Sequence, residues 1–206
     1  VFMRKGQAGN RQASPPETTS TPCVAVITAS YHEPLDVLEN TLTCFYNMSY
    51  HNKRLFLLDD TRYDLPGSDA EQMAKYRADI EALCRRIGVN LFRRKWRGAK
   101  AGIINDFLRF TEGKMEEGFE FCGYAEDDRG EDIKYVAVFD ADQNATRDFL
   151  EPLVSMMEQN PKLAFVQTPQ YYTNFEKNRV ARAAGLQQAV FYEFICEGKG
   201  MKDAMF

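Results

Sequence analysis

The sequence predicts an α/β fold, in which a mostly parallel β-sheet carries helices on both faces. Short runs rich in β-branched and aromatic residues alternate along the chain with segments whose apolar residues recur at helical spacing. Such alternation connects parallel strands through helices that cover both faces of the sheet. At 206 residues the chain suits one domain with a substantial core.

Five strands and five helices are expected in this order. The strands are CVAVITA (23–29), RLFLLDD (54–60), VNLFRR (89–94), YVAVFDA (135–141) and LAFVQTP (163–169). The helices are expected over 34–46, 68–88, 101–110, 147–157 and 180–198. The second helix has the clearest boundaries, with Ser68 or Asp69 able to cap its start and Gly88 able to close its end.

Two segments do not fit the alternation. Residues 1–22 are rich in Ser, Thr, Pro, Gln and Gly, and this composition predicts a disordered or extended leader before the domain at 23–206. Residues 112–132 are acidic and interrupted by glycines, which indicates an inserted surface loop.

The composition excludes several classes of protein. A net charge of −4 argues against a nucleic-acid-binding protein. The five cysteines lack CxxC spacing and are expected to be reduced, mostly core thiols, and two histidines make a His-rich metal site unlikely on residue count alone. No run approaches the ~20 apolar residues that span a bilayer. The chain begins without Met and stops at KDAMF, so we expect a fragment of a longer protein.

Polar residues follow nearly every predicted strand. The strand ends read ASYHEP, LDDT, KWRGAKAG, DAD and QTPQYY. Ligands of open α/β sheets bind beyond the carboxyl ends of the strands, so these segments are candidates for one site.

The DAD segment places Asp140 and Asp142 at the end of the fourth strand. Mg²⁺ or Mn²⁺ is typically held by one or two carboxylates together with substrate phosphates, so the pair suits a metal-bound diphosphate. Two solvated acids in a turn remain an alternative.

Calcium is a second alternative for this segment. Asp140, Asp142, Asn144, Asp148 and Glu151 match the ligand spacing of an EF-hand loop. Three features count against calcium. Ala145 stands where the loop needs Gly, Arg147 stands at a usually apolar position, and a predicted strand precedes the segment. Asn144 likewise argues against a phosphatase of the Asp-x-Asp-x-Thr kind.

The other strand ends carry weaker signals. Asp59 and Asp60 could accept hydrogen bonds from a base or a ribose, or could cap a turn. Lys95, Arg97 and Lys100 could neutralise a diphosphate, although the segment is not a Walker loop.

The ordered set of segments resembles family 2 glycosyltransferases of the GT-A fold, in the cellulose synthase branch. ASYHEP is similar to that branch's P-T-Y-N-E-P, LLDDT to L-D-D-G and GAKAGIIN to H-A-K-A-G-N-L-N. VFDADQNATRDFL is similar to DAD-H-x-P-x-x-x-F-L, and VQTPQYYTN to V-Q-T-P-x-x-x-x-N. The resemblance runs from about Cys23 to the end of the chain.

The resemblance implies roles for individual residues. Tyr31 and Glu33, with Ser30 beside them, would contact the nucleoside together with Asp59 and Asp60. Lys100 would touch the diphosphate, and Asp140 and Asp142 would hold Mg²⁺ or Mn²⁺. Gln167, Gln170 and Tyr171 would flank the sugar and the acceptor. Asp59 and Asp142 would take part in catalysis.

The resemblance also implies an activity. The parent enzyme would transfer a sugar from a nucleotide sugar, with UDP-glucose as the expected donor, to a glycan acceptor with inversion, making a β-linked polysaccharide. It would be a membrane-spanning protein with this segment at the cytoplasmic face. Ser30, Thr61, Gly98 and Gln143 depart from the branch's pattern.

The branch's T-E-D base and Q-x-x-R-W motif do not occur in the chain. We therefore expect the isolated chain to bind nucleotide weakly and to transfer no sugar. Two alternatives stay open: a nucleotidyltransferase, disfavoured because no Gly-rich loop follows the first strand, and a non-catalytic calcium-binding module.

Overall fold

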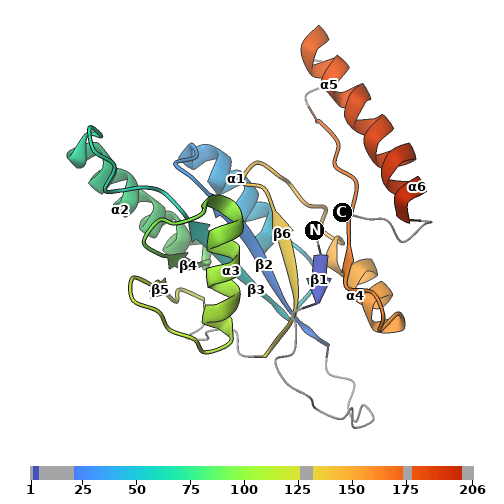
Figure 1. Ribbon diagram of the computed structural model, residues 1–206, viewed down its shortest axis with the longest axis horizontal. Helices are drawn as coiled ribbons and strands as arrows, with labels where there is room; N and C mark the ends of the chain where they lie inside the picture. The colour runs from blue at the N-terminus through green and yellow to red at the C-terminus, as the bar shows by residue number, and fades with distance from the viewer. Residues whose placement is uncertain (1, 5–20, 126–131, 174–177, 201–206) are drawn as a thin grey trace. The chain divides into compact units, whose positions relative to one another are not determined.

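The structure, a computed structural model, describes residues 2–4, 21–125, 132–173 and 178–200. Its described strands form one sheet in the order β5-β4-β3-β2-β6-β1-β7 (Figure 1). The strands are β1 Phe2–Arg4, β2 Cys23–Ser30, β3 Lys53–Asp59, β4 Asn90–Arg93, β5 Glu120–Cys122, β6 Ile133–Phe139 and β7 Phe165–Val166. The helices are α1 Leu35–Tyr46, α2 Ala70–Ile87, α3 Ala99–Thr111, α4 Leu150–Gln159, α5 Arg179–Val190, the π-helical η1 Phe191–Cys196 and α6 Glu197–Gly200.

The sheet is mostly parallel, as predicted. Strands β4, β3, β2 and β6 pair in parallel, and β7 runs in the same direction because β1 lies antiparallel between it and β6. Only β1 and β5 run the other way among the described strands. Five parallel strands flanked by helices are consistent with the GT-A fold.

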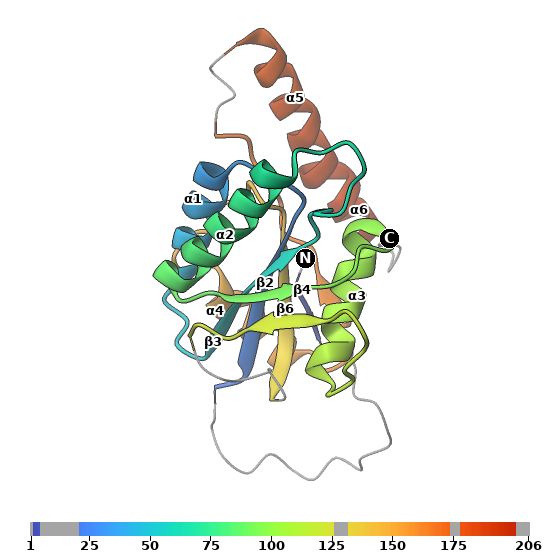
Figure 2. The same ribbon diagram turned by 90° about the vertical axis from the view of Figure 1, so that its left-hand side faces the viewer.

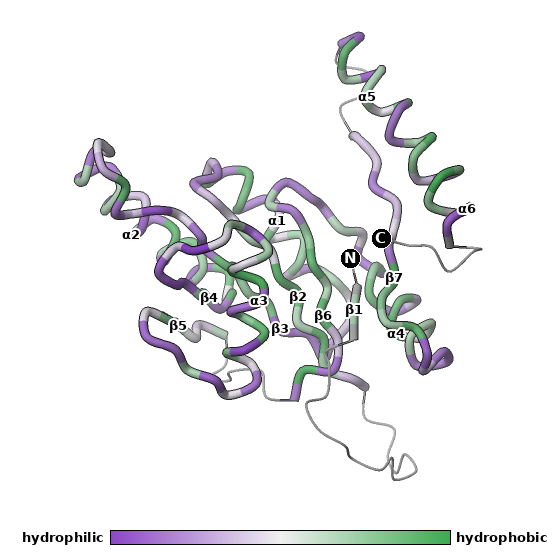
Figure 3. Tube along the Cα trace, viewed as in Figure 1, coloured by the Kyte–Doolittle hydropathy of each residue, from purple (hydrophilic) through white to green (hydrophobic). Residues whose placement is uncertain are grey.

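Two hydrophobic clusters cover the two faces of the sheet. Alternate residues of β2 point to opposite faces, so Val24 and Val26 join one cluster while Ala25 and Ile27 join the other. Helices α1, α2 and α4 contribute to the first cluster and α3 to the second, and Figure 2 shows α1 and α2 on the side opposite α3. Hydrophobic residues are concentrated in the central strands in Figure 3.

Helix α2 confirms its predicted boundaries. The Asp69 carboxylate accepts hydrogen bonds from the backbone N–H groups of Glu71 and Gln72, and Gly88 follows the last residue. Ser68 instead donates its hydroxyl to the Leu65 carbonyl, so Asp69 is the cap.

The predicted leader and loop both contain strands. Phe2–Arg4 form β1, although the composition of residues 1–22 suggested a disordered or extended leader. The backbone groups of β1 pair with those of both β6 and β7. Residues 5–20 lie outside the described residues. Within the predicted loop, Glu120–Cys122 form β5, whose Phe121 ring lies 5.0 Å from that of Phe110. Residues 126–131 lie outside the described residues.

Most other boundaries also differ from the prediction by a few residues, and three of these differences concern the ends of α4, β7 and α1. Helix α4 begins at Leu150, since residues 141–149 form turns after β6. The last strand is reduced to Phe165–Val166, because its ladder is with the short β1. Pro34 precedes α1 as its N-cap in an extended conformation.

The chain divides into two units, Val1–Val166 and Gln167–Phe206. The first contains the sheet and both hydrophobic clusters. In the described part of the second, α5, η1 and α6 follow one another without a break and no residue of α5 is buried. Cys44, Cys84, Cys122 and Cys196 are free thiols, and Cys23 and Cys84 are buried. Within the described ranges, no helix has the length and apolar character needed to cross a membrane.

Candidate active site

The carboxyl ends of β2, β3 and β6 lie next to one another because these strands are neighbours in the parallel part of the sheet. A cavity of about 340 Å³ opens there, which we call the strand-end pocket. Its lining consists of Ala29, Ser30, Tyr31, Glu33, Asp60, Lys100, Asp140, Ala141 and Asp142. Seven of the residues predicted from the sequence therefore meet at one site.

Thr41 and Gln143 fix the loop after β6 that carries the two carboxylates. Thr41 of α1 is buried and donates its hydroxyl to the Ala141 carbonyl at 2.8 Å, which anchors the residue between Asp140 and Asp142. Gln143 accepts a hydrogen bond from the Asp140 N–H at 2.9 Å and donates to the Asp140 carboxylate at 3.1 Å. Among the described residues Asp142 has no hydrogen bond or ion pair, so its carboxylate is available to a ligand.

Lys100 lies in the first turn of α3 and forms an ion pair with Asp140. The helix starts after Gly98, whose φ of 70° lies in the left-handed region that glycine adopts without strain. The Asp140 carboxylate thus already binds one cation, the Lys100 ammonium group. The carboxylate oxygens of Asp140 and Asp142 form a donor set that suits Mg²⁺ or Mn²⁺.

Gly102 allows the segment before α3 to fold back tightly. A Cβ atom at this position would lie 2.4 Å from the Arg97 carbonyl oxygen and 3.0 Å from Arg94 Nη2. The glycine at the end of GAKAG therefore allows α3 to approach the backbone of Arg97 closely, which helps to place Lys100 at the pocket.

Asp60 lines the strand-end pocket and is 4% exposed. Its backbone N–H donates to the Ser30 carbonyl at 2.9 Å, and its Oδ1 lies 3.2 Å from Arg94 Nη2. Burial raises the pKa of the Asp60 carboxyl to about 6, although the charge of Arg94 opposes this shift.

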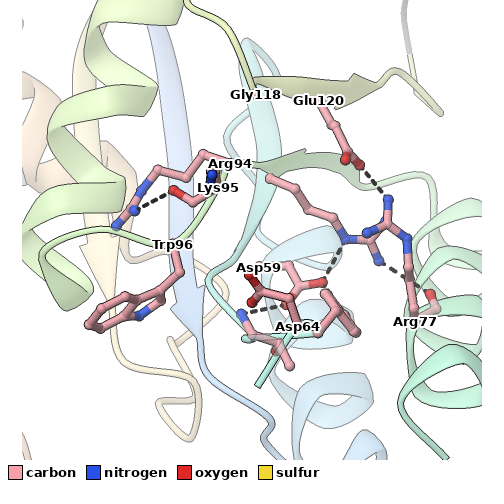
Figure 4. A pocket seen from close by; sticks show the side chains of 11 residues that line it. Asp59, Asp64, Arg77, Arg94, Lys95, Trp96, Gly118 and Glu120 are labelled. Atoms are coloured by element: carbon pink, nitrogen blue, oxygen red, sulfur yellow. Dashed lines mark hydrogen bonds and ion pairs between the residues drawn. The ribbon is translucent and has the colours of Figure 1, made fainter. Parts of the chain in front are cut away.

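Asp59 faces a different pocket, of about 290 Å³, shown in Figure 4. Its carboxylate accepts hydrogen bonds from Arg93 Nε at 2.7 Å and from the Tyr63 hydroxyl at 2.6 Å. Arg93 also binds Glu81 at 2.5 Å. Burial and the neighbouring Asp59 raise the pKa of Tyr63, which keeps the phenol protonated as a donor.

Asp59 does not line the strand-end pocket, so the adjacent acids predicted as one pair are separated by the strand. Asp59 is buried inside an ion-pair cluster, whereas Asp60 opens toward the site. In Figure 4, Arg77 and Glu120 lie on one side of Asp59, with Arg94, Lys95 and Trp96 on the other.

The segment after β2 presents an aromatic ring to the site. Tyr31 is 51% exposed at the rim of the pocket. The next residue, His32, has a φ of 55°, and its N–H donates to the hydroxyl of the buried Thr61 at 3.0 Å. Thr61, which departs from the Gly of the resembling pattern, therefore fixes this turn.

Gln167, Gln170 and Tyr171 belong to the second unit. Gln167 and Gln170 are half-buried, and Tyr171 is 62% exposed. The Gln167 side chain donates to the Thr168 carbonyl at 3.1 Å. Their roles at the sugar and the acceptor stay predictions.

An EF-hand arrangement does not form at residues 140–151. Strand β6 precedes them in place of a helix, and the Glu151 Oε1 atom accepts a hydrogen bond from Ser49 at 2.7 Å. No group of three or more acidic, His or Cys side chains suited to a metal occurs in the part of the chain that the structure describes.

Sequence reasoning missed four residues of the site region: Thr41, Gln143, Arg94 and Asp106. Thr41 and Asp106 lie inside helices whose apolar pattern drew attention to other positions, while Gln143 was noted only as a departure. Arg94 ended a predicted strand, and its burial between two carboxylates has no local sequence signal.

Comparisons with known proteins show the family to which the chain is similar. The family model described as "Glycosyl transferase family 2" matches residues 25–204. The chain is 30% identical over 197 residues to "Cellulose synthase catalytic subunit [UDP-forming]" of Pseudomonas fluorescens (strain SBW25), covering 92% of this chain and 22% of that protein.

Two further relatives show the same pattern. The chain is 28% identical to "Cellulose synthase 2" of Novacetimonas hansenii, covering 93% of this chain and 10% of that protein. It is 28% identical to "Cellulose synthase catalytic subunit [UDP-forming]" of Xanthomonas axonopodis pv. citri (strain 306), covering 90% and 22%. The chain thus spans less than a quarter of the length of each of these relatives.

Proposed function

The chain belongs to glycosyl transferase family 2, and from the strand-end pocket we propose that it binds the nucleotide-sugar donor of a cellulose synthase-like enzyme. The donor class is a UDP-sugar, with UDP-glucose as the expected one. The observation that supports this most directly is the meeting of Asp60, Lys100, Asp140 and Asp142, from three separate segments, around one cavity.

Each residue around the pocket suits a different part of the donor. Asp60, a buried acceptor in the pocket lining, suits an N–H or hydroxyl of the nucleoside, and the exposed ring of Tyr31 suits a face of the base. The Lys100 ammonium group, which pairs with Asp140, can instead pair with the diphosphate when the donor binds.

Asp140 and Asp142 would hold Mg²⁺ or Mn²⁺. A bound divalent cation would neutralise the charge of the departing nucleoside diphosphate. Gln143 and Thr41 keep Asp140 and Ala141 in place, so the carboxylates need little reorganisation when the donor binds. We further propose that the full enzyme forms a β-linked product by inversion, with Gln167, Gln170 and Tyr171 flanking the sugar and the acceptor.

Calorimetric titration of the chain with UDP, with and without Mn²⁺, tests the proposal. We expect Mn²⁺-dependent binding that Asp142→Ala weakens at least tenfold, roughly the loss of one charged ligand contact. Asp148→Ala is the matched control, because Asp148 is exposed and lies outside the pocket lining.

Equal binding by the native chain and Asp142→Ala would contradict the metal assignment. Calcium binding without nucleotide binding would favour the calcium-binding module. Release of pyrophosphate when the chain is incubated with UTP together with a sugar phosphate would favour a nucleotidyltransferase.

A further inference from the structure

Arg94 lies buried between two carboxylates that come from different elements. Its side chain is 1% exposed. The Nη2 atom lies 3.2 Å from Asp60 Oδ1, and the Nε atom lies 3.0 Å from Asp106 Oδ2. Arg94 also donates to the backbone carbonyls of Lys95 at 3.0 Å and Ala99 at 3.3 Å. The guanidinium is therefore held from several sides, and only one of its contacts is with the strand-end pocket.

Both carboxylate contacts of Arg94, with Asp60 and with Asp106, have ion-pair distances without hydrogen-bond geometry, and the Nε atom has no hydrogen-bond partner among the described residues. Within the described part of the chain, Asp60 Oδ1 is buried and has no hydrogen-bond partner. A buried carboxylate oxygen left in this state is costly unless a ligand supplies a donor. Asp60 lines the pocket, so a ligand there can reach the carboxylate.

Asp106 holds the other side of Arg94. It is 4% exposed in α3 and accepts two hydrogen bonds from Arg97, at 3.0 Å from Nε and 2.8 Å from Nη2. Asp106 does not line the strand-end pocket. Its neighbour Phe107 packs in the second hydrophobic cluster, which fixes this turn of α3 against the sheet.

We propose that Asp106 is a positioning residue of the donor site, whose charge shares Arg94 with Asp60 and thereby leaves Asp60 free to accept a hydrogen bond from the nucleotide. The inference rests on the proposed function, because it assigns a role within the same pocket.

The geometry of the guanidinium supplies the reason. A guanidinium that faces a single carboxylate tends to form a bidentate pair, which occupies both carboxylate oxygens. Asp106 lies in ion-pair contact with the Nε edge at 3.0 Å, and Asp60 lies against Nη2 at 3.2 Å, so the two carboxylates share the charge of Arg94. Without the charge of Asp106, Arg94 can turn toward Asp60 and compete with the ligand.

The effects of the neighbouring charges on the pKa of Asp60 are consistent with this role of Asp106. Arg94 lowers the pKa of Asp60, while Asp59 and Asp106 raise it; burial is the largest cause of the elevation. Across the pocket lie Glu33, Lys100, Asp140 and Asp142. Removing the charge of Asp106 should therefore lower the pKa of Asp60, both directly and by giving Arg94 to Asp60 alone.

The first test measures UDP-glucose affinity at pH 7.5 with Mn²⁺ by calorimetry. Asp106→Asn is expected to weaken binding about tenfold, the usual size of one lost hydrogen bond to a charged group. Glu116→Gln is the matched control, since Glu116 binds Arg97 at 2.6 Å but does not contact Arg94. Its affinity should equal that of the native chain.

A double-mutant cycle separates positioning from a general structural effect. In an Asp60→Asn background, Asp106→Asn should cause no further loss of affinity, because the group on which it acts is gone. Equal losses in both backgrounds would overturn the proposal.

The second test does not need the nucleotide. Carbon-13 NMR titration of the Asp60 carboxyl should show a lower midpoint in Asp106→Asn and an unchanged midpoint in Glu116→Gln. Arg97→Gln should raise the midpoint, because Asp106 then draws Arg94 away from Asp60, and the half-exposed Arg97 tolerates substitution if Asp106→Asn does not fold.

The outcomes keep the two proposals apart. Absence of UDP-glucose binding by the native chain would end the proposed function, while the NMR midpoints would still decide whether Asp106 controls Asp60. Unchanged midpoints in both Asp106→Asn and Arg97→Gln would overturn the positioning role even if the nucleotide binds.

Discussion

At the scale of single residues, the two neighbouring acids Asp59 and Asp60 have opposite environments. Asp59 is neutralised by Arg93 and bound by Tyr63, whereas Asp60 is buried, lies at ion-pair distance from Arg94 without hydrogen-bond geometry, and opens to the pocket. The alternation of side chains along a strand produces this difference, because consecutive residues point to opposite faces. A carboxylate that is buried and under-satisfied is the one expected to depend on pH and on ligand.

The elevated pKa of Asp60 predicts pH-dependent donor binding. The ionised carboxylate is the acceptor, and its population falls as pH decreases through about 6. Between pH 7.5 and pH 5.0 the affinity for UDP-glucose should therefore fall about tenfold. UDP-glucose is the appropriate ligand because it has no terminal phosphate monoester that titrates in this range.

Calorimetry at several pH values checks this expectation, with Asp60→Asn as the control that should bind weakly and without this pH dependence. A flat profile for the native chain would contradict the assignment of Asp60 as an ionised acceptor.

Gly102 should not tolerate a side chain. Gly102→Ala would bring Cβ to 2.4 Å from a backbone carbonyl, and we expect the free energy of unfolding to decrease by about 1–3 kcal/mol, as for other overpacked sites. Urea denaturation measures this change. Gly198→Ala has no heavy atom within 4 Å of its new Cβ, so it should leave the transition of the first unit unchanged. Stability equal to that of the native chain would show that Arg97 moves aside without cost.

At the scale of elements, each strand end reaches the site with support from a neighbouring helix. Helix α1 anchors Ala141 through Thr41, and α3 brings Lys100 to Asp140. Helix α2 contributes packing rather than pocket lining: Ile80, Leu83 and Cys84 are buried, and Tyr76 donates its hydroxyl to the Glu33 carbonyl at 2.6 Å. The position of the segment after β2 therefore depends on α2.

Loss of the α2 cap should measure this support. Asp69→Ala removes the acceptor for two backbone N–H groups and should lower the free energy of unfolding by about 0.5–2 kcal/mol. Ser68→Ala is the control from the adjacent position, where no helix N–H group is capped, and should change stability less. Thermal or urea denaturation compares the two. A larger loss for Ser68→Ala would contradict the cap assignment.

At the scale of the whole chain, the pocket is built entirely from the first unit. All of its lining residues precede Val166, and both hydrophobic clusters lie in the same unit. The second unit contributes Gln167, Gln170 and Tyr171, whose proposed roles concern the sugar and the acceptor rather than the nucleotide.

A chain of residues 1–166 should therefore fold and bind UDP with Mn²⁺ within about threefold of the affinity of the full chain, since no lining contact is removed. Calorimetry on both chains makes the comparison, and circular dichroism confirms that the shorter one folds. Loss of UDP binding by a folded 1–166 chain would assign part of the nucleotide site to the second unit.

The sequence by itself determined the α/β class, the order of the main elements and seven of the residues that line the pocket. Hydrophobic periodicity and the order of polar strand ends are local patterns, and they survive folding unchanged in β2, β3, β4 and β6. The tertiary structure decided what depends on partners distant in sequence. It separated Asp59 from Asp60, placed Phe2–Arg4 in the sheet and set Arg94 between Asp60 and Asp106. Pairing of strands and burial of charges are properties of contacts between segments, so no window of sequence contains them.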